Sequence, residues 1–383
     1  MSKKKSSLRI AMIGHKRIPS REGGVEIVVE ELASRMAEAG CEVTVYNRGG
    51  HHVAGKENDN SKTRQTEYKG IRLITVPTSS RRSLNAICYA LGATLHALFG
   101  HYDVIHYHAE GSCAVLWIPH LFGIRTIATI HGLDWQRSKW GGFATKFLLL
   151  GEKTAVRYAD EIIVLSKNVQ QYFLDTYQRR TVLIPNGICI PEARPADLIR
   201  EKYGLQPERY LLFLARIVPE KGLHYLIEAY QQSDTDMPLV IAGGSSHTDA
   251  YLEQIQEMTA GDPAIIMTGF VEGQLLEELY SNCYIYLLPS DIEGMPISLL
   301  EALSYGRACL CSDIKENRET AGECASYFAK GDVQDLTRQL NAMLQSENQN
   351  KESDCKKRKE YVSTRYDWNR IVQQTMHLYR EFF

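Results

Sequence analysis

Short apolar runs alternate with longer stretches of helical spacing along most of the chain. Leu8–Ile13 is an apolar run that ends at Gly14, which is typical of a strand buried in a parallel sheet. Val25–Ala39 then repeats apolar residues every three or four positions and stops at Gly40, which indicates a helix with a glycine after its end. The polar stretch His51–Lys69 lacks either pattern and predicts a loop. The same criteria predict further strands at Glu42–Tyr46, Ile71–Val76, Val104–His106, Arg125–Ile130, Glu161–Leu165 and Val182–Ile184, and helices at Leu84–Phe99 and Phe143–Tyr158.

The alternation pauses at residues 187–207, where prolines and a glycine surround one short predicted helix, and this stretch is the expected interdomain linker. A second series then begins, with strands predicted at Tyr210–Ala215, Leu239–Ala242, Ala264–Thr268, Tyr284–Leu288 and Ala308–Cys311. Two such series predict two doubly wound, Rossmann-like α/β domains, residues 1–188 and 189–367. Ligands of such sheets lie beyond the carboxyl ends of the strands, so a cleft between the two domains is the expected site.

Length and composition agree with this organisation. A chain of 383 residues has room for two domains, and 44% hydrophobic with 23% charged residues is ordinary for a soluble protein. The 44 basic and 46 acidic residues give a net charge of −2, which excludes a global basic field for nucleic acid. The nine cysteines are dispersed and include no CxxC pair, so they do not resemble a disulfide framework. Cys309 and Cys311 lie on a predicted strand, and we expect two buried thiols there.

Neither the N-terminal apolar run nor the longest apolar stretch indicates insertion into a membrane. The N-terminal apolar run is too short for the core of a signal peptide. Leu84–Phe99 is interrupted by polar residues and falls short of the roughly 20 residues that span a bilayer. We therefore expect a cytoplasmic protein whose membrane contact, if any, is peripheral.

The turn after the first strand has the sequence GHKRIPSREGGVE, without the G-x-G-x-x-G pattern of dinucleotide-binding proteins. The second strand ends in Tyr46-Asn47-Arg48, which offers no acidic residue for a ribose, so a nicotinamide dehydrogenase is disfavoured. Gly23 and Gly24 open the following helix, where a phosphate can approach free N–H groups. A flexible loop with a glycine N-cap is the alternative interpretation.

The segment DIEGMPISLLEAL, residues 291–303, is the strongest candidate for chemistry. Pro296 suits the first turn of a helix, which puts Glu293 just before the helix and Glu301 inside it. Free N–H groups near Ile297 and Ser298 then lie between two carboxylates. Carboxylates suit sugar hydroxyls and a helix start suits phosphate, so the segment predicts a nucleotide-sugar site. The alternative is a helix cap and a solvated glutamate.

A second candidate is LARIVPEKGL, residues 214–223. Arg216 follows a buried strand and Lys221 precedes a helix, so both cations are expected at the carboxyl end of the sheet. Two cations in that place can clamp a diphosphate. Surface charge without function is the alternative. Asp234 and Asp236 match a DxD metal motif superficially, but they precede a strand and so lie at the opposite end of the sheet.

These motifs, in this order, resemble the retaining glycosyltransferase family four, also called glycosyl transferases group one, which has the GT-B fold. The resemblance covers nearly the whole chain and is most specific in the C-terminal half. It rests on Arg216, Lys221, Gly243-Gly244, Gly269-Phe270 and Glu293-x7-Glu301. The segment IPSREGGVE is similar to the start of a rhamnosyltransferase-like branch of bacterial envelope-sugar enzymes, and this second match is less specific.

The resemblance implies roles for individual residues on the donor side. Arg216 and Lys221 would neutralise the donor diphosphate and the departing nucleotide. Glu301 would hold the ribose, and Glu293 would contact the transferred sugar. Further implied donor contacts are Gly243, Gly269, Phe270, Gly294, Met295, Pro296, Ile297 and Ser298.

On the N-terminal side, Gly23 and Gly24 would approach the phosphates. His131 would be the active-site histidine near the sugar, with a satisfied loop histidine as the alternative, and Asn186 would line the cleft. The amphipathic helix Trp368–Phe383 would pack back on the N-terminal domain. No metal and no cofactor is implied, since the leaving phosphate of this family is thought to deprotonate the acceptor.

The acceptor side has weaker signals. His108 and Glu110 follow a strand and are acceptor-site candidates, with simple loop polarity as the alternative. Two mixed basic and apolar stretches, Arg81–Phe99 and Lys139–Leu150, suit an anionic membrane surface, although helices packed on a sheet would also explain them. Together they predict peripheral binding near a lipid-linked saccharide acceptor.

The sequence therefore predicts an enzyme that moves a hexose or deoxyhexose from a nucleotide-diphosphate sugar to a saccharide acceptor in bacterial envelope or exopolysaccharide synthesis. A nucleotide-sugar epimerase of the same fold is one rival. A non-catalytic subunit that binds sugar nucleotides is another. Neither the base, the sugar, the acceptor nor the oligomeric state follows from the sequence.

Overall fold

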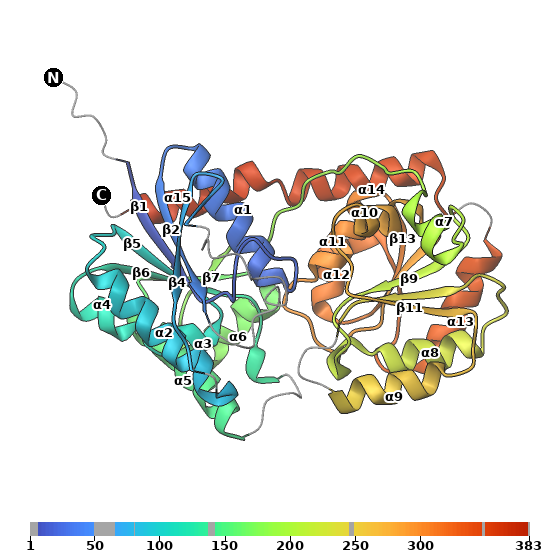
Figure 1. Cartoon of the computed structure of the whole chain (residues 1–383), viewed down its shortest axis with the longest axis horizontal. Coiled ribbons are helices and arrows are strands. Elements are labelled where there is room, and N and C mark those ends of the chain that lie inside the picture. Colours follow the sequence, from blue (N-terminus) through green and yellow to red (C-terminus); the bar gives the residue numbers. More distant parts are fainter. Residues whose placement is uncertain are drawn as a thin grey trace. The chain divides into compact units, whose positions relative to one another are not determined.

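The computed structural model describes residues 7–49, 66–79, 81–136, 142–244, 249–346 and 349–381. Contacts within these residues divide the chain into two compact units. The first holds the chain up to Gln136, residues 142–187 and the last helix, and the second holds Ile188–Asp367. Each unit has one largely parallel sheet flanked by helices (Figure 1), and the predicted α/β fold class is confirmed.

The first sheet has the strand order β3-β4-β2-β1-β5-β6-β7-β8. Every pair in it is parallel except β3 with β4. Its strands are β1 (Arg9–Ile13), β2 (Glu42–Arg48), β3 (Glu67–Tyr68), β4 (Ile71–Val76), β5 (Val104–His108), β6 (Arg125–Ile130), β7 (Glu161–Val164) and β8 (Val182–Leu183). Its helices are α1 (Gly24–Glu38), α2 (Arg82–Leu98), α3 (Glu110–Cys113), α4 (Trp117–Leu121), α5 (Gly142–Tyr158), α6 (Lys167–Tyr177) and α15 (Trp368–Arg380), with the 3-10 turn η1 (Asp134–Gln136).

The second sheet has the strand order β11-β10-β9-β12-β13-β14, and its pairs are all parallel. Its strands are β9 (Leu211–Leu214), β10 (Leu239–Ala242), β11 (Ile265–Gly269), β12 (Ile285–Leu288), β13 (Ala308–Ser312) and β14 (Ser326–Phe328). Its helices are α7 (Leu198–Tyr203), α8 (Leu223–Gln231), α9 (Asp249–Thr259), α10 (Gly273–Asn282), α11 (Ile297–Ser304), α12 (Lys315–Ala321), α13 (Val333–Gln345) and α14 (Glu352–Arg365), with the 3-10 turns η2 (Pro219–Lys221) and η3 (Gly322–Cys324).

The central strands are buried and mostly apolar because helices cover both faces of each sheet. Strands β5, β6, β10, β12 and β13 are buried at every position, as expected for parallel strands that see no solvent. Cys309 and Cys311 are buried and unpaired by disulfides, as expected. Burial raises the pKa of both thiols, so they remain protonated at neutral pH.

The structure corrects two expectations. Glu67 and Tyr68, expected in a loop, form β3, which pairs antiparallel with the start of β4. A two-residue edge strand is too short to show any periodicity, which is why the sequence pattern missed it. Pro296, expected in the first turn of α11, is the N-cap, because the helix begins at Ile297. Residues 51–65 of the predicted loop lie outside the described residues.

The second half of the predicted linker is packed structure. The buried carboxylate of Glu278 in α10 accepts hydrogen bonds from the backbone N–H groups of Asp197 and Ile199, both at 3.0 Å. It thereby satisfies donors that the start of α7 leaves open. Arg194 pairs with Glu277 of the same helix at 2.7 Å. The stretch from Arg194 onward is therefore part of the second unit rather than a free tether.

Helix α15 completes the first unit and packs beside α1 (Figure 1). The hydroxyl of Tyr379 lies 2.5 Å from Nδ1 of His106 in β5. Arg125 of β6 donates to the carbonyl oxygen of Leu378 at 2.6 Å. Gly187 lies against the ring of Trp368, where a Cβ would come within 2.3 Å of the indole. The last helix is thus fixed to the sheet and to the end of the first chain segment.

Candidate functional site

The strand order of the second sheet creates a switch point between β9 and β12. The chain proceeds from β9 outward through β10 and β11, and then returns to place β12, β13 and β14 on the other side. At such a point the loops that follow the two central strands diverge and leave room for a ligand at the carboxyl edge. These loops carry Arg216 and Lys221 after β9, and Glu293 to Pro296 after β12.

Backbone contacts fix the two loops to each other. The N–H of Asp291 donates to the carbonyl oxygen of Glu220 at 2.9 Å. Gly222 has φ +66°, and a Cβ there would lie 2.0 Å from the carbonyl oxygen of Pro289. Only glycine permits both that conformation and that approach. The position of η2 beside the loop after β12 therefore depends on Gly222.

Lys221 and Glu293 form an ion pair at this junction. Nζ of Lys221 lies 2.5 Å from Oε1 of Glu293, and their side chains are only 12% and 8% exposed. The same carboxylate oxygen accepts a hydrogen bond from the hydroxyl of Ser290 at 2.6 Å. Arg216, half-buried, follows β9 on the same edge of the sheet. The site thus combines two cations with a carboxylate that is held in place from two sides.

Helix α11 begins beside this ion pair. Its N-cap, Pro296, makes no side-chain capping bond, and the first N–H groups of a helix have no partner inside it. Those N–H groups, of Ile297 and Ser298 among others, form the positive end of the helix dipole. Glu301 lies one turn further along the same helix. The start of α11 is therefore suited to an anion, with a carboxylate nearby for hydroxyl groups.

Sequence patterns do not reveal the tyrosine that contacts Glu301. The hydroxyl of Tyr280, in α10, lies 3.1 Å from Oε2 of Glu301 and 3.3 Å from the carbonyl oxygen of Ser298. The ring of Tyr280 stacks on Tyr305 with 5.6 Å between centroids. Burial raises the pKa of Tyr280 well above its usual value, so the phenol keeps its proton and acts as a donor. No local pattern marks this residue, because it comes from a different helix.

Glycines join the loops after β9, β10 and β11. Gly243 donates to the carbonyl oxygen of Gly269 at 2.9 Å, and Ile217 donates to that of Gly244 at 3.0 Å. A Cβ on Gly243, whose φ is +151°, would lie 1.9 Å from the carbonyl oxygen of Ala215. Phe270, with 51% of its surface exposed, follows at the same edge. An exposed aromatic ring at this edge suits a flat, apolar group such as a nucleotide base.

The first unit has the equivalent switch point between β1 and β5. His108 ends β5 and is fully buried, and its Nδ1 lies 3.1 Å from Nε2 of His131, which follows β6. Burial, reinforced by neighbouring histidines, lowers the pKa of His108, so it is neutral at physiological pH. Glu110, the first residue of α3, is also fully buried. Direct contact of His108 or Glu110 with an acceptor stays a prediction, and the burial of His108 favours a role through His131.

The loop that carries His131 is anchored by a buried carboxylate that the sequence did not reveal. Oε2 of Glu152, in α5, accepts a hydrogen bond from the indole of Trp135 in η1 at 3.2 Å. Its other oxygen accepts from Tyr172 at 2.9 Å and from Tyr177. Glu152 has no exposed surface. Three aromatic donors thus satisfy one charge and fix the segment that follows β6.

The start of α1 differs from the expected open phosphate site. Gly23 is the N-cap and Gly24 the first helical residue, as the motif predicts. The carboxylate of Glu26, however, lies over Gly23, where a Cβ would come within 2.5 Å of Oε2. Glu26 also accepts a hydrogen bond from the backbone N–H of Lys16 at 2.8 Å. An acid already occupies the positive end of this helix, so an anion would have to compete with it. Asn186 follows β8 and is buried.

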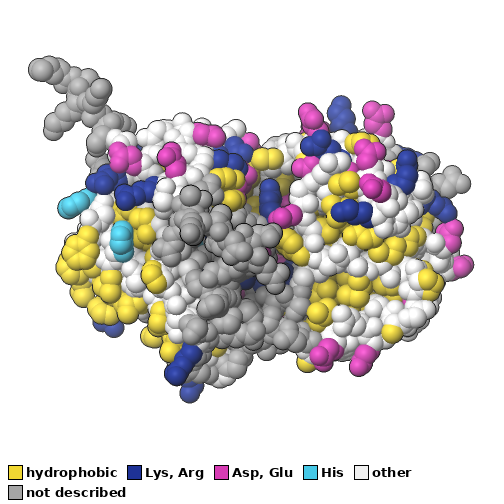
Figure 2. Space-filling model, in the orientation of Figure 1, with side chains coloured by type: hydrophobic (Ala, Val, Ile, Leu, Met, Phe, Trp, Pro, Cys, Tyr) yellow, Lys and Arg dark blue, Asp and Glu magenta, His cyan; other side chains and the backbone are white. Residues whose placement is uncertain are grey.

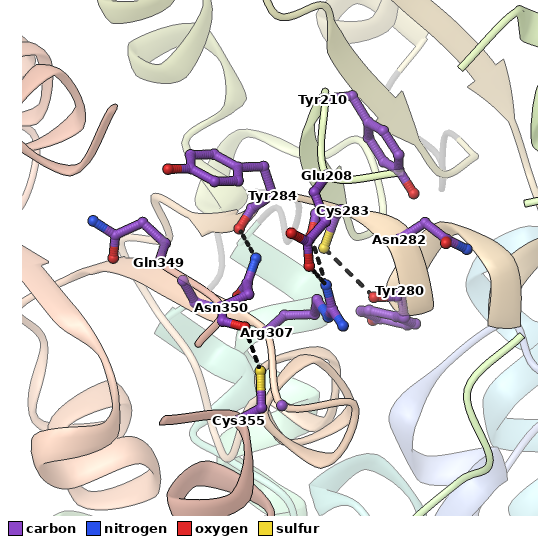
Figure 3. A network of polar contacts seen from close by, with 12 residues as sticks. Glu208, Tyr210, Tyr280, Asn282, Cys283, Tyr284, Arg307, Gln349, Asn350 and Cys355 are labelled. Carbon is purple, nitrogen blue, oxygen red and sulfur yellow. Dashed lines mark hydrogen bonds and ion pairs between the residues drawn. The ribbon is translucent and has the colours of Figure 1, made fainter. Parts of the chain in front are cut away.

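The amino ends of the strands in the second sheet hold a network of structural contacts (Figure 3). Arg307, which precedes β13, donates to Glu208 at 2.8 Å and to the carbonyl oxygen of Cys283 at 3.4 Å. Asn350 donates to the carbonyl oxygen of Tyr284 at 2.9 Å. This network joins the segments that enter β9, β12 and β13, at the edge opposite the candidate site.

Asp234 and Asp236 belong to that opposite edge as well. They lie between α8 and β10, and Asp236 forms an exposed ion pair with Arg209 at 2.8 Å. Within the described ranges, no group of three or more histidine, cysteine, aspartate or glutamate side chains is arranged to hold a metal ion. Nor does that part of the chain contain a helix with the length and apolar character to cross a membrane.

Similarities to known proteins agree with this geometry. A family model described as Glycosyltransferase Family 4 matches residues 22–190, and one described as Glycosyl transferases group 1 matches residues 196–361. The alpha-maltose-1-phosphate synthase of Mycolicibacterium smegmatis is 23% identical over 98% of this chain and 99% of that protein. The O-antigen chain mannosyltransferase B of Escherichia coli is 25% identical over 50% of this chain and 49% of that protein.

Among solved structures, Anabaena Alr3699/HepE in complex with UDP-glucose has a TM-score of 0.79 at 17% identity, over 97% of this chain and 99% of that chain. The two family models cover the two units in turn, and each unit has the largely parallel sheet that the sequence predicts. The chain belongs to the glycosyl transferases of group 1 and has the GT-B fold.

Proposed function

We propose that this glycosyltransferase is a retaining, metal-independent enzyme that moves a hexose or deoxyhexose from a nucleotide-diphosphate sugar to a saccharide acceptor. The observation that carries the proposal is the nearly buried Lys221–Glu293 pair beside the start of α11. The pair brings a cation suited to a diphosphate and a carboxylate suited to sugar hydroxyls together at the switch point of the second sheet. Its support from relatives is the UDP-glucose bound in the HepE structure.

The donor diphosphate binds to Arg216, Lys221 and the first N–H groups of α11. Without a donor, the ammonium of Lys221 pairs with Glu293, and with a donor it is shared with a phosphate oxygen. Glu293 then accepts hydrogen bonds from hydroxyls of the sugar, and Glu301 accepts those of the ribose. Gly269 and Phe270 contact the base, and Gly243, Gly294 and Met295 complete the donor contacts.

In the transfer step, the bond between the anomeric carbon and the diphosphate oxygen breaks while a bond to the acceptor oxygen forms on the same face. The acceptor proton passes to the departing diphosphate, so no protein nucleophile and no metal ion is needed. Negative charge on the diphosphate increases as the bond breaks. Lys221 and Arg216 therefore bind the transition state more strongly than the ground state, which is the condition for catalysis.

The first unit supplies the remaining groups. His131 contacts the transferred sugar and is held by His108 and by the anchor at Trp135. Gly23, Gly24 and Asn186 line the donor from this side, and Glu110 belongs to the acceptor side. The acceptor is a lipid-linked saccharide of a bacterial envelope or exopolysaccharide, and the enzyme works in the cytoplasm at the inner membrane face. A relative named for O-antigen chains supports this assignment, and a rhamnosyltransferase-like activity is the branch favoured by IPSREGGVE.

A donor screen tests the proposal first. A bound nucleotide sugar stabilises the folded chain by mass action, so one class among UDP-, GDP- and dTDP-sugars should raise the melting temperature. The effective donor is then incubated alone and with a panel of lipid-linked saccharides, in the presence and absence of EDTA. We expect acceptor-dependent transfer, retained anomeric configuration and no effect of EDTA.

The same experiment separates the rival functions. A product formed from the donor alone would identify an epimerase. Donor binding without turnover across the acceptor panel would identify a non-catalytic subunit. Inverted configuration in the product, or loss of transfer in EDTA, would refute the corresponding part of the proposed mechanism.

A further inference from the structure

Helix α2 is apolar on both of its faces. Its inner face, including Tyr89, Ala93 and Ala97, is buried in the core of the first unit. Its outer face carries three exposed large apolar residues at intervals of one or two turns, namely Leu84, Leu91 and Leu95, and exposed Phe99 follows directly after the helix. A surface helix normally has a polar outer face, so this arrangement calls for a partner.

The two neighbouring helices extend the apolar area. Helix α4 packs against both α2 and α5, and it carries exposed Trp117 and Leu121, followed directly by Phe122. Leu121 and Phe122 are each 69% exposed, and Phe99 is 83% exposed. Figure 2 shows hydrophobic side chains gathered where α2 and α4 lie. We define the outer apolar surface as Leu84, Leu91, Leu95, Phe99, Trp117, Leu121, Phe122 and Leu150.

The structure refines the expectation from sequence. In the stretch Lys139–Leu150, only Leu150 of the three consecutive leucines is exposed, while Leu148 is buried, because successive helical residues point in different directions. Lys139 and Trp140 lie outside the described residues. Helix α4, which sequence patterns did not single out, contributes the aromatic side chains that the surface needs.

The exposed charged side chains of α5, and the one directly before α2, are all basic. Lys146, Lys153 and Arg157 are exposed along α5, and Arg81 is exposed before α2. Helices α2 and α4 contain no acidic residue, and the single acid of α5 is the fully buried Glu152. In a chain with 46 acidic residues, this selective absence is informative. The outer apolar surface is thus bordered by positive charge.

We propose that the outer apolar surface docks on a membrane that contains anionic lipids. Aromatic and leucine side chains enter the boundary of headgroups and acyl chains, while lysine and arginine contact the phosphates. A second copy of the chain fits less well, because a symmetric contact would bring like charges together. The proposal adds a defined docking face to the membrane location proposed above, and it does not depend on catalysis.

Co-sedimentation of the full chain with vesicles tests the proposal. Vesicles of phosphatidylcholine alone are compared with vesicles that also contain phosphatidylglycerol, without donor or acceptor. We expect binding to the anionic vesicles and much weaker binding to the neutral ones. A chain that stays in the supernatant with anionic vesicles would overturn the proposal whether or not the enzyme transfers sugar.

Two pairs of variants separate the apolar and charged contributions. Leu121→Glu with Phe122→Glu should lower the vesicle partition coefficient at least about tenfold, whereas Leu174→Glu, an exposed leucine of α6 outside the surface, should leave it unchanged. Lys146→Glu with Lys153→Glu should lower it roughly tenfold at low salt and much less at about 0.5 M salt. The matched charge change Lys356→Glu with Lys357→Glu, on α14, should have no such effect.

Circular dichroism and thermal unfolding verify that each variant is folded, and Phe122→Ser is the milder substitution if the double variant is not. Equal vesicle binding by the folded Leu121/Phe122 variant would refute the docking face. Sedimentation velocity without lipid tests the alternative that a second copy of the chain binds this surface. A dimer that dissociates in the Leu121/Phe122 variant would show that this surface binds a second copy instead.

Discussion

The ammonium of Lys221 lies 2.5 Å from Oε1 of Glu293, although 72 residues separate the two along the chain. The pair joins the loop after β9 to the loop after β12 at the switch point of the second sheet. Both side chains are nearly buried, so their charges interact with little solvent screening. The pair therefore gives a direct test of the proposed donor site.

Replacing Lys221 with alanine should lower kcat by roughly 10²- to 10³-fold, because the variant loses a cation that opposes charge developing on the diphosphate. Steady-state kinetics with the donor found in the screen measures this effect at a temperature where the variant is folded. The control is Arg209→Ala, which removes an exposed cation at the opposite edge of the same sheet and should leave kcat unchanged. A kcat near that of the parent enzyme in Lys221→Ala would contradict the diphosphate assignment.

Replacing Tyr280 with phenylalanine should raise the donor KM about fivefold, with a smaller change in kcat. The variant keeps the ring that stacks on Tyr305 but loses the hydroxyl that donates to Glu301, a net interaction of about 1 kcal/mol. Tyr230→Phe is the matched control, since its hydroxyl donates to the carbonyl oxygen of Met237 at the amino edge of the sheet. If Tyr280→Phe lowers stability without raising the donor KM, the tyrosine is structural and does not position Glu301.

Gly243→Ala should destabilise the second unit far more than Gly261→Ala. Both glycines have positive φ, +151° and +81°, so both substitutions incur the strain of an unfavourable backbone, about 1 kcal/mol. Only at Gly243 would the new Cβ also meet a backbone atom, 1.9 Å from the carbonyl oxygen of Ala215, whereas nothing lies within 4 Å at Gly261. Urea unfolding of the full chain measures the difference. Equal losses of stability would mean that the loops after β9 and β10 can separate freely.

Acid should destabilise the first unit through its buried histidines. Burial lowers the pKa of His15 to about 4 and that of His106 to about 3, whereas both titrate near 6.5 when unfolded. Below pH 6.5 these histidines therefore bind protons in the unfolded chain but not in the folded chain. The free energy of unfolding consequently falls as the pH decreases toward 4. Each histidine contributes a slope of about 1.4 kcal/mol per pH unit in this range.

Urea unfolding at pH 7 and pH 5 measures this slope. His106→Gln should reduce the loss of stability between the two pH values, since glutamine does not titrate. His377→Gln, which removes an exposed histidine of α15, should not. An unchanged pH dependence in His106→Gln would show that His106 becomes protonated in the folded state without penalty.

Local sequence patterns determined the strands, most helices and the order of the motifs. Runs such as Leu239–Ala242 are apolar because parallel strands are buried on both faces, so the residues of such a strand indicate its burial directly. Arg216, Lys221 and Glu293 lie after a strand or before a helix, and such positions can be predicted from the flanking residues. Glu301 follows from its place one turn inside the predicted helix. Strand β3 was not predicted, because two residues are too few to show the alternation of apolar and polar positions that indicates a strand.

Only the tertiary structure decided which side chains act on one another and which faces remain open. Tyr280 contacts Glu301, the carboxylate of Glu26 lies over Gly23, and three aromatic donors form hydrogen bonds with Glu152. Each of these contacts depends on how the chain packs. The same holds for the outer apolar surface, because a leucine in an apolar helix faces the core or the solvent according to its neighbours. Hydrophobic periodicity indicates that an element has a buried face. Which side chains contact one another, and which apolar faces stay exposed, depends on contacts between residues far apart in the chain.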